Sequence, residues 1–163
     1  MRTVQSPRSF LISCFLGTWL LGFASGVWPQ RVLAQVDVST LASGFIPNPT
    51  VMAGVGGGDR RAAQVVNSRQ TPTGLCLGYI SAEPHEEITL ENSFSNLEVS
   101  VESELDTTLI ISGPGGVWCN DDSKGSHNPA IVGEWLPGLY RIWVGSYQFE
   151  QTPDYQLYIS DQS

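Results

Sequence analysis

Apolar and polar residues alternate with a period of two along most of the chain beyond residue 75. In the clearest case, segment 97–102, Leu97, Val99 and Val101 alternate with acidic or hydroxyl-bearing side chains. Successive side chains of a strand point to opposite faces, so this pattern predicts a strand with one buried and one solvated face. Six further segments have strand character: 76–80, 88–90, 107–111, 117–119, 139–144 and 155–159.

Turn residues separate these segments, and no long stretch has the period of a helix. Between segments 107–111 and 117–119, the run Gly113-Pro114-Gly115-Gly116 combines a fixed φ with a residue that tolerates positive φ. This run predicts a β-hairpin with a type II turn. Seven or so short strands joined by frequent turns predict an all-β domain, a two-layer antiparallel β-sandwich over residues 75–163.

Residues 35–74 are the least regular part of the sequence. Pro47 and Pro49 interrupt any helix, and Gly54 and the run 56–58 break whatever precedes them. We expect an ordered N-terminal arm followed by a glycine-rich loop. A short helix over 60–66, capped by Asp59, is also consistent with the sequence, although Val65 and Val66 suit a strand equally well.

The N-terminus has the pattern of a targeting segment. Arg2 and Arg8 precede an uncharged apolar stretch over 10–28, and Val32-Leu33-Ala34 offers a cleavage site before Gln35. We therefore expect a secretory signal peptide over 1–34, a secreted, periplasmic or cell-envelope location, and no stable membrane anchor after cleavage. An uncleaved anchor is the competing interpretation, because the apolar stretch is almost long enough to span a bilayer.

Net charge excludes one class of partner. The chain of 163 residues carries a formal charge of −8, and loss of the three arginines in residues 1–34 takes it to −11. A polyanion such as nucleic acid is therefore not an expected partner.

Export gives the cysteines a specific meaning. Cys14 lies within the predicted signal peptide, which leaves Cys76 and Cys119 as a pair in an oxidising compartment. Such a pair usually forms a disulfide. Closing this loop stabilises the fold by about 3.5 to 4 kcal/mol in the loop-entropy model. Two buried, reduced thiols are the alternative.

Oxygen-bearing side chains gather after the predicted hairpin. Asn120, Asp121 and Asp122 follow its second strand, while Asp106 precedes its first strand and Asn128 lies in the next polar loop. Calcium takes six to eight oxygen ligands from such loops, so these five residues are candidate calcium ligands. The alternative is that they cap turns through hydrogen bonds to nearby backbone N–H groups.

Catalytic signatures are sparse. His85 lies in a proline-containing turn and His127 in a polar loop, and the sequence contains no Gly-x-Ser-x-Gly or His-Glu-x-x-His motif. A set formed by Ser126, His127 and Asp122 is the catalytic alternative, although adjacency in sequence is no evidence for it. We lean against an enzyme and leave the question open.

Segment 139–144 carries a candidate contact surface. Alternation places Tyr140, Ile142 and Val144 on one face and Arg141 and Trp143 on the other. An outward Trp143, with Arg141 beside it, would stack on a sugar or another packed polymer. A strand buried on both faces would instead place Trp143 in the core, which we favour.

Several short motifs occur together in a characteristic order. They are Gly-Tyr-Ile (78–80), Asp-Thr-Thr-Leu (106–109), Gly-Pro-Gly-Gly (113–116), Cys-Asn-Asp-Asp (119–122), Asn-Pro (128–129), Pro-Gly-Leu-Tyr (137–140) and Trp-Val-Gly-Ser (143–146). Over about residues 40–160, the chain resembles the bacterial pre-peptidase C-terminal domain family. The resemblance implies a jelly-roll-like β-sandwich that accompanies secreted hydrolases, and some related modules bind calcium or extracellular polymers.

These observations together predict a secreted, non-catalytic module with a binding or structural accessory role in the cell envelope or medium. Its expected partner is an extracellular polymer or an exported protein, with calcium as a candidate ion. Two alternatives stay open at this stage. One is a small exported hydrolase that uses the acidic cluster, and the other is a partner or inhibitor of a separate exported protease.

Overall fold

The structure, a computed structural model, describes residues 38–163, so the predicted signal peptide lies outside the described residues. Regular structure in this range is almost entirely β. The strands are β1 (Val38–Leu41), β2 (Thr50–Val55), β3 (Arg60–Arg61), β4 (Gln70–Thr71), β5 (Gly74–Leu75), β6 (Tyr79–Ile80), β7 (Glu86–Leu90), β8 (Phe94–Glu102), β9 (Thr107–Gly113), β10 (Gly116–Asn120), β11 (Ala130–Trp135), β12 (Gly138–Ser146) and β13 (Asp154–Asp161). One short helix, α1 (Ala62–Val65), lies between β3 and β4. Within the described range, no helix is long and apolar enough to cross a membrane.

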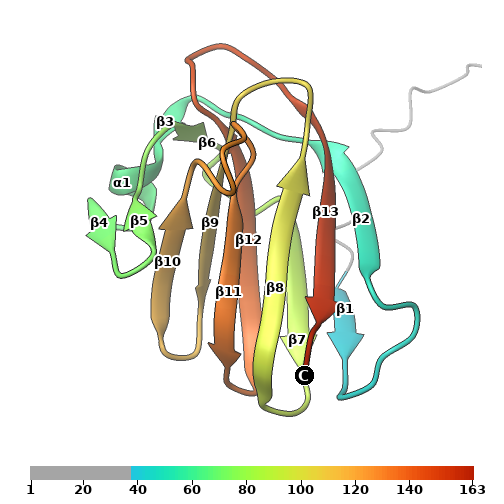
Figure 1. Ribbon diagram of the computed structural model, residues 1–163. Coiled ribbons are helices and arrows are strands. Elements are labelled where there is room, and N and C mark those ends of the chain that lie inside the picture. The colour runs from blue at the N-terminus through green and yellow to red at the C-terminus, as the bar shows by residue number, and fades with distance from the viewer. Residues whose placement is uncertain (1–37) are drawn as a thin grey trace, which may run out of the picture. The chain divides into compact units, whose positions relative to one another are not determined.

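The strands form two stacked sheets (Figure 1). A seven-stranded sheet contains the order β1-β7-β12-β6-β3, with β9 paired to both β12 and β10. A four-stranded sheet has the order β11-β8-β13-β2, and β4 and β5 form a separate small hairpin. Every pair is antiparallel except β1 with β7. The structure confirms the all-β, two-layer sandwich.

The main core lies between the two sheets and follows the predicted alternation. On β8, Leu97, Val99 and Val101 are buried, as the sequence pattern requires. Tyr140 of β12 is fully buried in the same cluster. Its hydroxyl donates to the Leu136 carbonyl at 2.8 Å, which satisfies the polar group of this large core side chain.

The sandwich begins earlier than the sequence indicated. β1 pairs with β7, and β2 pairs with β13 over six residues, so both strands belong to the sheets rather than to an arm. The expected start of the sandwich at residue 75 is therefore corrected to Val38 for the described residues. The sequence hid β2 because its exposed face is also apolar, which removes the alternation of apolar and polar residues.

Three local expectations also differ from the structure. The helix begins after Arg61 without any side-chain cap, so Asp59 does not cap it. The strand expected over 76–80 is reduced to β6, because Gly78 adopts a φ of +78° before Tyr79. Strand β11 was not expected at all. The predicted turn is present, with Gly115 at a φ of +98° after Pro114.

A second, smaller core covers the outer face of the seven-stranded sheet. Trp143 and Ile110 pack there against Ala62, Ile80 and the disulfide. Cys76 and Cys119 are bonded, with their Cα atoms 5.0 Å apart, which confirms the predicted bridge. At Trp143, strand β12 is therefore covered on both faces.

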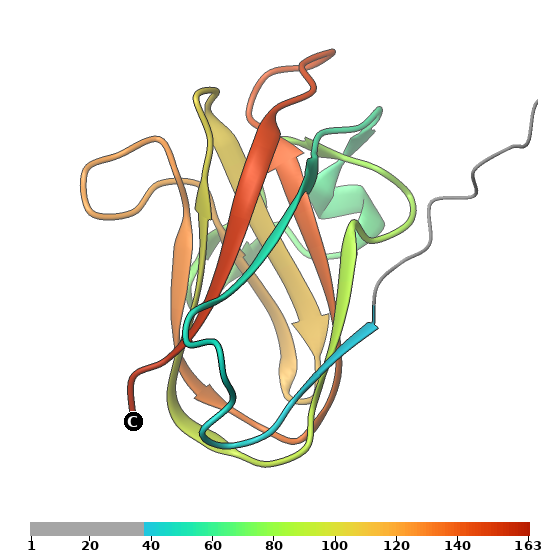
Figure 2. The same ribbon diagram turned by 90° about the vertical axis from the view of Figure 1, so that its right-hand side faces the viewer.

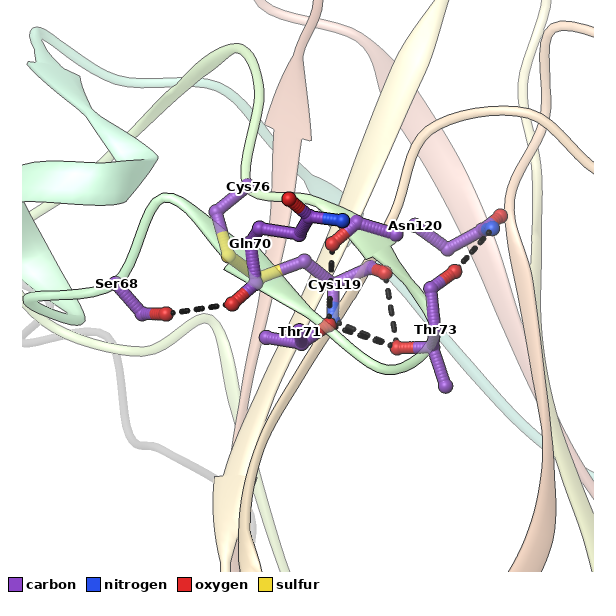
Figure 3. The surroundings of a disulfide bond; sticks show 8 residues. Ser68, Gln70, Thr71, Thr73, Cys76, Cys119 and Asn120 are labelled. Atoms are coloured by element: carbon purple, nitrogen blue, oxygen red, sulfur yellow. Dashed lines mark hydrogen bonds between the residues drawn. A yellow bond between two sulfur atoms is a disulfide. The ribbon is translucent and has the colours of Figure 1, made fainter.

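The β4–β5 hairpin is joined to β10 by side chains as well as by the disulfide (Figure 3). The N–H of Cys119 donates to the hydroxyls of Thr71 and Thr73, each at 3.1 Å. The Thr73 hydroxyl in turn donates to the Cys119 carbonyl at 3.0 Å. These bonds satisfy backbone groups on the free edge of β10, an edge that would otherwise offer a pairing template.

His85, just before β7, is a half-buried group whose charge the fold opposes. Its Nδ1 accepts a hydrogen bond from the N–H of Val144 at 3.2 Å, which requires an unprotonated Nδ1. Burial lowers the pKa of His85 below its usual value, and a hydrogen bond to the Gly57 backbone partly opposes this shift. The native state therefore favours neutral imidazole.

We expect this histidine to contribute to acid sensitivity. A lowered native pKa means that the unfolded chain binds the proton more readily, so stability falls as pH drops below about 6.5. Denaturant unfolding measured between about pH 7 and pH 5 checks this loss of stability. His85→Asn keeps an acceptor near the Nδ1 position without a titrating group, and should flatten the slope. An unchanged slope in this variant would contradict the role of His85.

Candidate functional site

Three strand ends meet at one end of the sandwich. Asp106 immediately precedes β9, Asp122 follows β10, and His127 lies in the loop that leads to β11. The antiparallel pairing of Asn120 with Leu109 places the end of β10 beside the start of β9. The N–H of Thr107 donates to the His127 carbonyl at 3.2 Å, which fixes the loop beside Asp106.

These ends bring two carboxylates and one imidazole together. His127 Nδ1 lies 3.9 Å from Asp106 Oδ2 and 3.7 Å from Asp122 Oδ1. One potential ligand atom from each of the three side chains lies within 4.8 Å of the others. Such a group can hold a cation through the carboxylate oxygens, and the imidazole adds a nitrogen ligand suited to transition metals.

The surroundings of Asp106 raise the pKa of its carboxyl group. Burial raises the pKa of Asp106, the neighbouring His127 imidazole opposes this, and the charges of Asp122 and Asp121 raise the pKa further. Asp106 Oδ1 is buried and has no hydrogen-bond partner in the described structure. The backbone N–H compensation that the sequence offered as an alternative to a cation is therefore lacking for this oxygen.

The other three candidate calcium ligands are placed differently. Asn120 accepts a hydrogen bond from the N–H of Ala130 and donates to the Thr73 carbonyl. Asn128 accepts from the Thr107 hydroxyl at 3.0 Å and donates to the Ser103 carbonyl at 3.0 Å. The Asn120 amide thus links the start of β11 to the β4–β5 hairpin, and the Asn128 amide links the start of β9 to the segment after β8. Among the described residues, Asp121 is not in the converging group, although its charge raises the pKa of Asp106.

The sequence did not predict that His127 lies beside Asp106. The two are 21 positions apart, and only the pairing of β9 with β10 and the return of the chain to β11 unite them. The carboxylates had a usable signal, since each lies next to a predicted strand. A polar loop histidine carries no comparable signal.

The structure gives no support to a serine nucleophile at this position. The Ser126 hydroxyl donates to the carbonyls of Ser123 and Asn128, at 2.9 Å and 3.2 Å. Within the described residues it forms no hydrogen bond to His127. The other histidine, His85, uses Nδ1 as an acceptor for Val144 and has its Nε2 3.4 Å from the Ser81 hydroxyl. That tautomer carries its proton on Nε2, so this nitrogen cannot accept a proton from Ser81.

Trp143 and Arg141, the residues expected to form a contact surface, differ in exposure. Trp143 is 6% exposed in the second core, so its ring is not available to stack on a polymer. Arg141 is exposed, and its Nε donates to Glu87 at 3.0 Å on the neighbouring strand. The interpretation of Trp143 as a core residue holds, and the stacking interpretation does not.

A groove runs beside the acidic group on the outer face of the four-stranded sheet. It is an open groove of about 1200 Å³, and its lining includes Glu98, Glu102, Lys124 and Asp154. The loop between β10 and β11 stands out from the sheet and forms one wall (Figure 2). Lys124 on this loop reaches back to Glu98, at 3.3 Å. Its charged lining residues are four acids and one lysine, and the loop that borders it also carries Asp122 and His127.

No protein-family model matches the chain. An uncharacterised protein of Synechococcus elongatus is 38% identical over 87 residues, which cover 51% of this chain and 63% of that protein. The chain therefore matches less than two thirds of this relative's length.

A structural neighbour belongs to the family that the sequence motifs resemble. It is the crystal structure of the pre-peptidase C-terminal domain of a collagenase from Bacillus anthracis. The two share 12% sequence identity with a TM-score of 0.43, over 77% of this chain and 97% of that one.

Proposed function

We propose that the protein is an exported, non-catalytic β-sandwich module that binds a partner in the cell envelope or medium. The observation that carries this proposal is the groove on the four-stranded sheet, bordered by the loop that carries Asp122 and His127. Ligand sites are commonly concave and present a few converging polar groups. The disulfide, which suits an oxidising compartment, supports export.

The proposal includes a divalent cation, with calcium as the leading candidate. Asp106 and Asp122 would supply carboxylate oxygens, and backbone carbonyls and water would complete the coordination. The buried, unpartnered Oδ1 of Asp106 supports a cation, because an adjacent positive charge would offset the cost of burying this carboxylate. A bound cation would also fix the β10–β11 loop, and with it one wall of the groove.

Thermal unfolding with and without added calcium tests the cation. Protein recovered from the medium or periplasm is the starting material, and its N-terminal sequence reports export directly. At a hundredfold excess over the dissociation constant, calcium should stabilise the fold by about 2.7 kcal/mol. Asp106→Asn or Asp122→Asn should abolish this shift, while the exposed Glu134→Gln on β11 serves as the matched control.

A zinc titration separates the roles of the ligands. Zinc uses imidazole readily, whereas calcium prefers oxygen. His127→Ala should therefore leave the calcium shift in place and remove any zinc shift. If neither ion changes the melting temperature, the proposed cation is rejected. The proposed binding role of the groove would then involve no cation.

A further inference from the structure

Strand β2 is an open edge of the four-stranded sheet. It pairs with β13 without any shift in register, and no described strand pairs with its other side (Figure 1). An unpaired edge presents a row of backbone donors and acceptors to any extended segment that approaches it.

The alternation of backbone hydrogen bonds shows which groups of β2 are free. The N–H of Gly56 donates to the Pro153 carbonyl at 2.8 Å, in the same register that joins β2 to β13. Hydrogen-bonding residues alternate along an antiparallel strand, so Thr50, Met52 and Gly54 also direct their backbone groups toward β13. The N–H and C=O groups of the intervening residues, Val51, Ala53 and Val55, therefore point away from the sheet.

Other sheet edges in the described structure are protected. The threonine hydroxyls of the β4–β5 hairpin bind the edge of β10, as described above. Strand β11 has a register irregularity between Gly133 and Trp135 and carries the exposed Glu134. Strands β1 and β3 are short, with four and two residues, and both residues of β3 are arginines. Bulges, charges and short length are the usual protections of an edge, and β2 has none of them.

The side chains of β2 that face solvent are apolar. Val51 is 48% exposed, Val55 is 57% exposed, and Ala53 between them is also exposed. Segment 50–58 contains no charged residue, in a chain whose net charge is −8. The edge strand itself therefore brings no charge to a contact between two copies, and the nearest acid on the neighbouring strand is Asp154, opposite Val55.

We propose that β2 pairs with β2 of a second copy of this chain, in an antiparallel arrangement around a two-fold axis at Ala53. The axis sets Ala53 opposite Ala53 of the second copy, and Val51 opposite Val55. In this register, Val51, Ala53 and Val55 of one copy lie opposite the same three residues of the other copy. Their backbone N–H and C=O groups, which point away from each sheet, then form hydrogen bonds with one another. The small apolar side chains also meet across the axis, and the sheet continues from one copy into the other.

Size and charge determine the strength of this pairing. Two six-residue edges bury much less than the roughly 1,200 Å² of a standard stable interface, so the dimer should be weak and dependent on concentration. Because both copies carry the same net negative charge, salt above about 0.15 M should strengthen the association. A partner recruited through opposite charge would show the reverse salt dependence.

Sedimentation equilibrium of the full chain, with the disulfide formed, tests the proposal. Wild-type protein should show a reversible monomer–dimer equilibrium. Ala53→Lys sets two ammonium groups against each other at the axis and should raise the dissociation constant about tenfold or more. Val132→Lys, at an exposed position on β11 at the opposite edge, is the matched control and should leave the equilibrium unchanged.

Mixing complementary variants tests the register. Ala53→Lys and Ala53→Asp should each be largely monomeric, whereas an equimolar mixture should restore dimers, because opposite charges then meet at the axis. Amide exchange at Val51, Ala53 and Val55 should slow as the wild-type protein is concentrated. Wild-type protein that stays monomeric at high salt and concentration would overturn the proposal, as would a dimer insensitive to Ala53→Lys. Capture of an extended peptide by a monomeric chain would instead assign the edge to another partner.

Discussion

Replacing both Cys76 and Cys119 with alanine is expected to lower the free energy of unfolding by about 4 kcal/mol. The bridge closes a loop with a sequence separation of 43 residues, and loss of this constraint gives the unfolded chain that much more conformational freedom. Both sulfurs lie in the second core, so truncation to alanine also removes packing against Trp143 and Ile110. A loss of this size is a large fraction of the stability of a typical single domain.

In the double-alanine variant, native structure should be lost first in the β4–β5 hairpin. The β4–β5 hairpin is a two-stranded unit of four paired residues, held to β10 by the disulfide and the threonine hydrogen bonds. Without the disulfide, amides around this hairpin should exchange with solvent before those of the main core. Denaturant unfolding gives the total loss, and hydrogen exchange gives its location.

Reduction supplies the control for this prediction. Wild-type protein treated with a reductant should lose a similar amount of stability, while the double-alanine variant should not respond to the reductant at all. A loss below about 1 kcal/mol in both experiments would mean that the hairpin and its threonine bonds hold the second core without the bridge.

Prediction from the sequence succeeded where a local pattern determines the structure. Strand β8 has one buried face, and a period of two expresses this directly. The hairpin of β9 and β10 follows from its proline and glycines, and the disulfide follows from an even pair of cysteines in a chain predicted to be exported. Each of these features depends on residues that are close in sequence or few in number.

Features that depend on distant segments were missed. Strand β2 is apolar on its exposed face, and among the described strands it pairs only with β13, about a hundred residues later, so no local pattern marks it. Gly54 in this strand looks like a helix or strand breaker. A side chain there would meet the Tyr155 hydroxyl of β13 at 2.6 Å, so the residue permits close packing instead. The approach of His127 to Asp106 likewise depends on tertiary structure.

Strand β12 shows why alternation alone cannot locate a binding surface. Alternation correctly separated Tyr140, Ile142 and Val144 from Arg141 and Trp143. It cannot say whether a second layer covers the other face, because that layer comes from residues 60–76, whose own pattern is weak. The second core therefore explains both the burial of Trp143 and the exposure of Arg141, which lies beyond that cover.

Trp143→Ala is expected to lower the free energy of unfolding by about 3 to 5 kcal/mol, the range for truncating a large buried aromatic residue. Trp143→Phe should cost much less. It keeps most of the ring volume, and it removes an indole N–H that is buried without a hydrogen-bond partner. Because Trp143 packs against the disulfide, its effect and that of the double-alanine variant should not add.

Arg141→Ala provides the matched comparison for Trp143→Ala on the same face of β12. The Arg141 side chain is 55% exposed, and its ion pair with Glu87 lies at the surface, so its loss should cost about 1 kcal/mol or less. Denaturant unfolding of both variants measures the difference. If Trp143 were a contact residue, its truncation would weaken partner binding and leave stability almost unchanged. A stability loss below about 1 kcal/mol for Trp143→Ala would therefore contradict its place in the second core and return it to the binding surface.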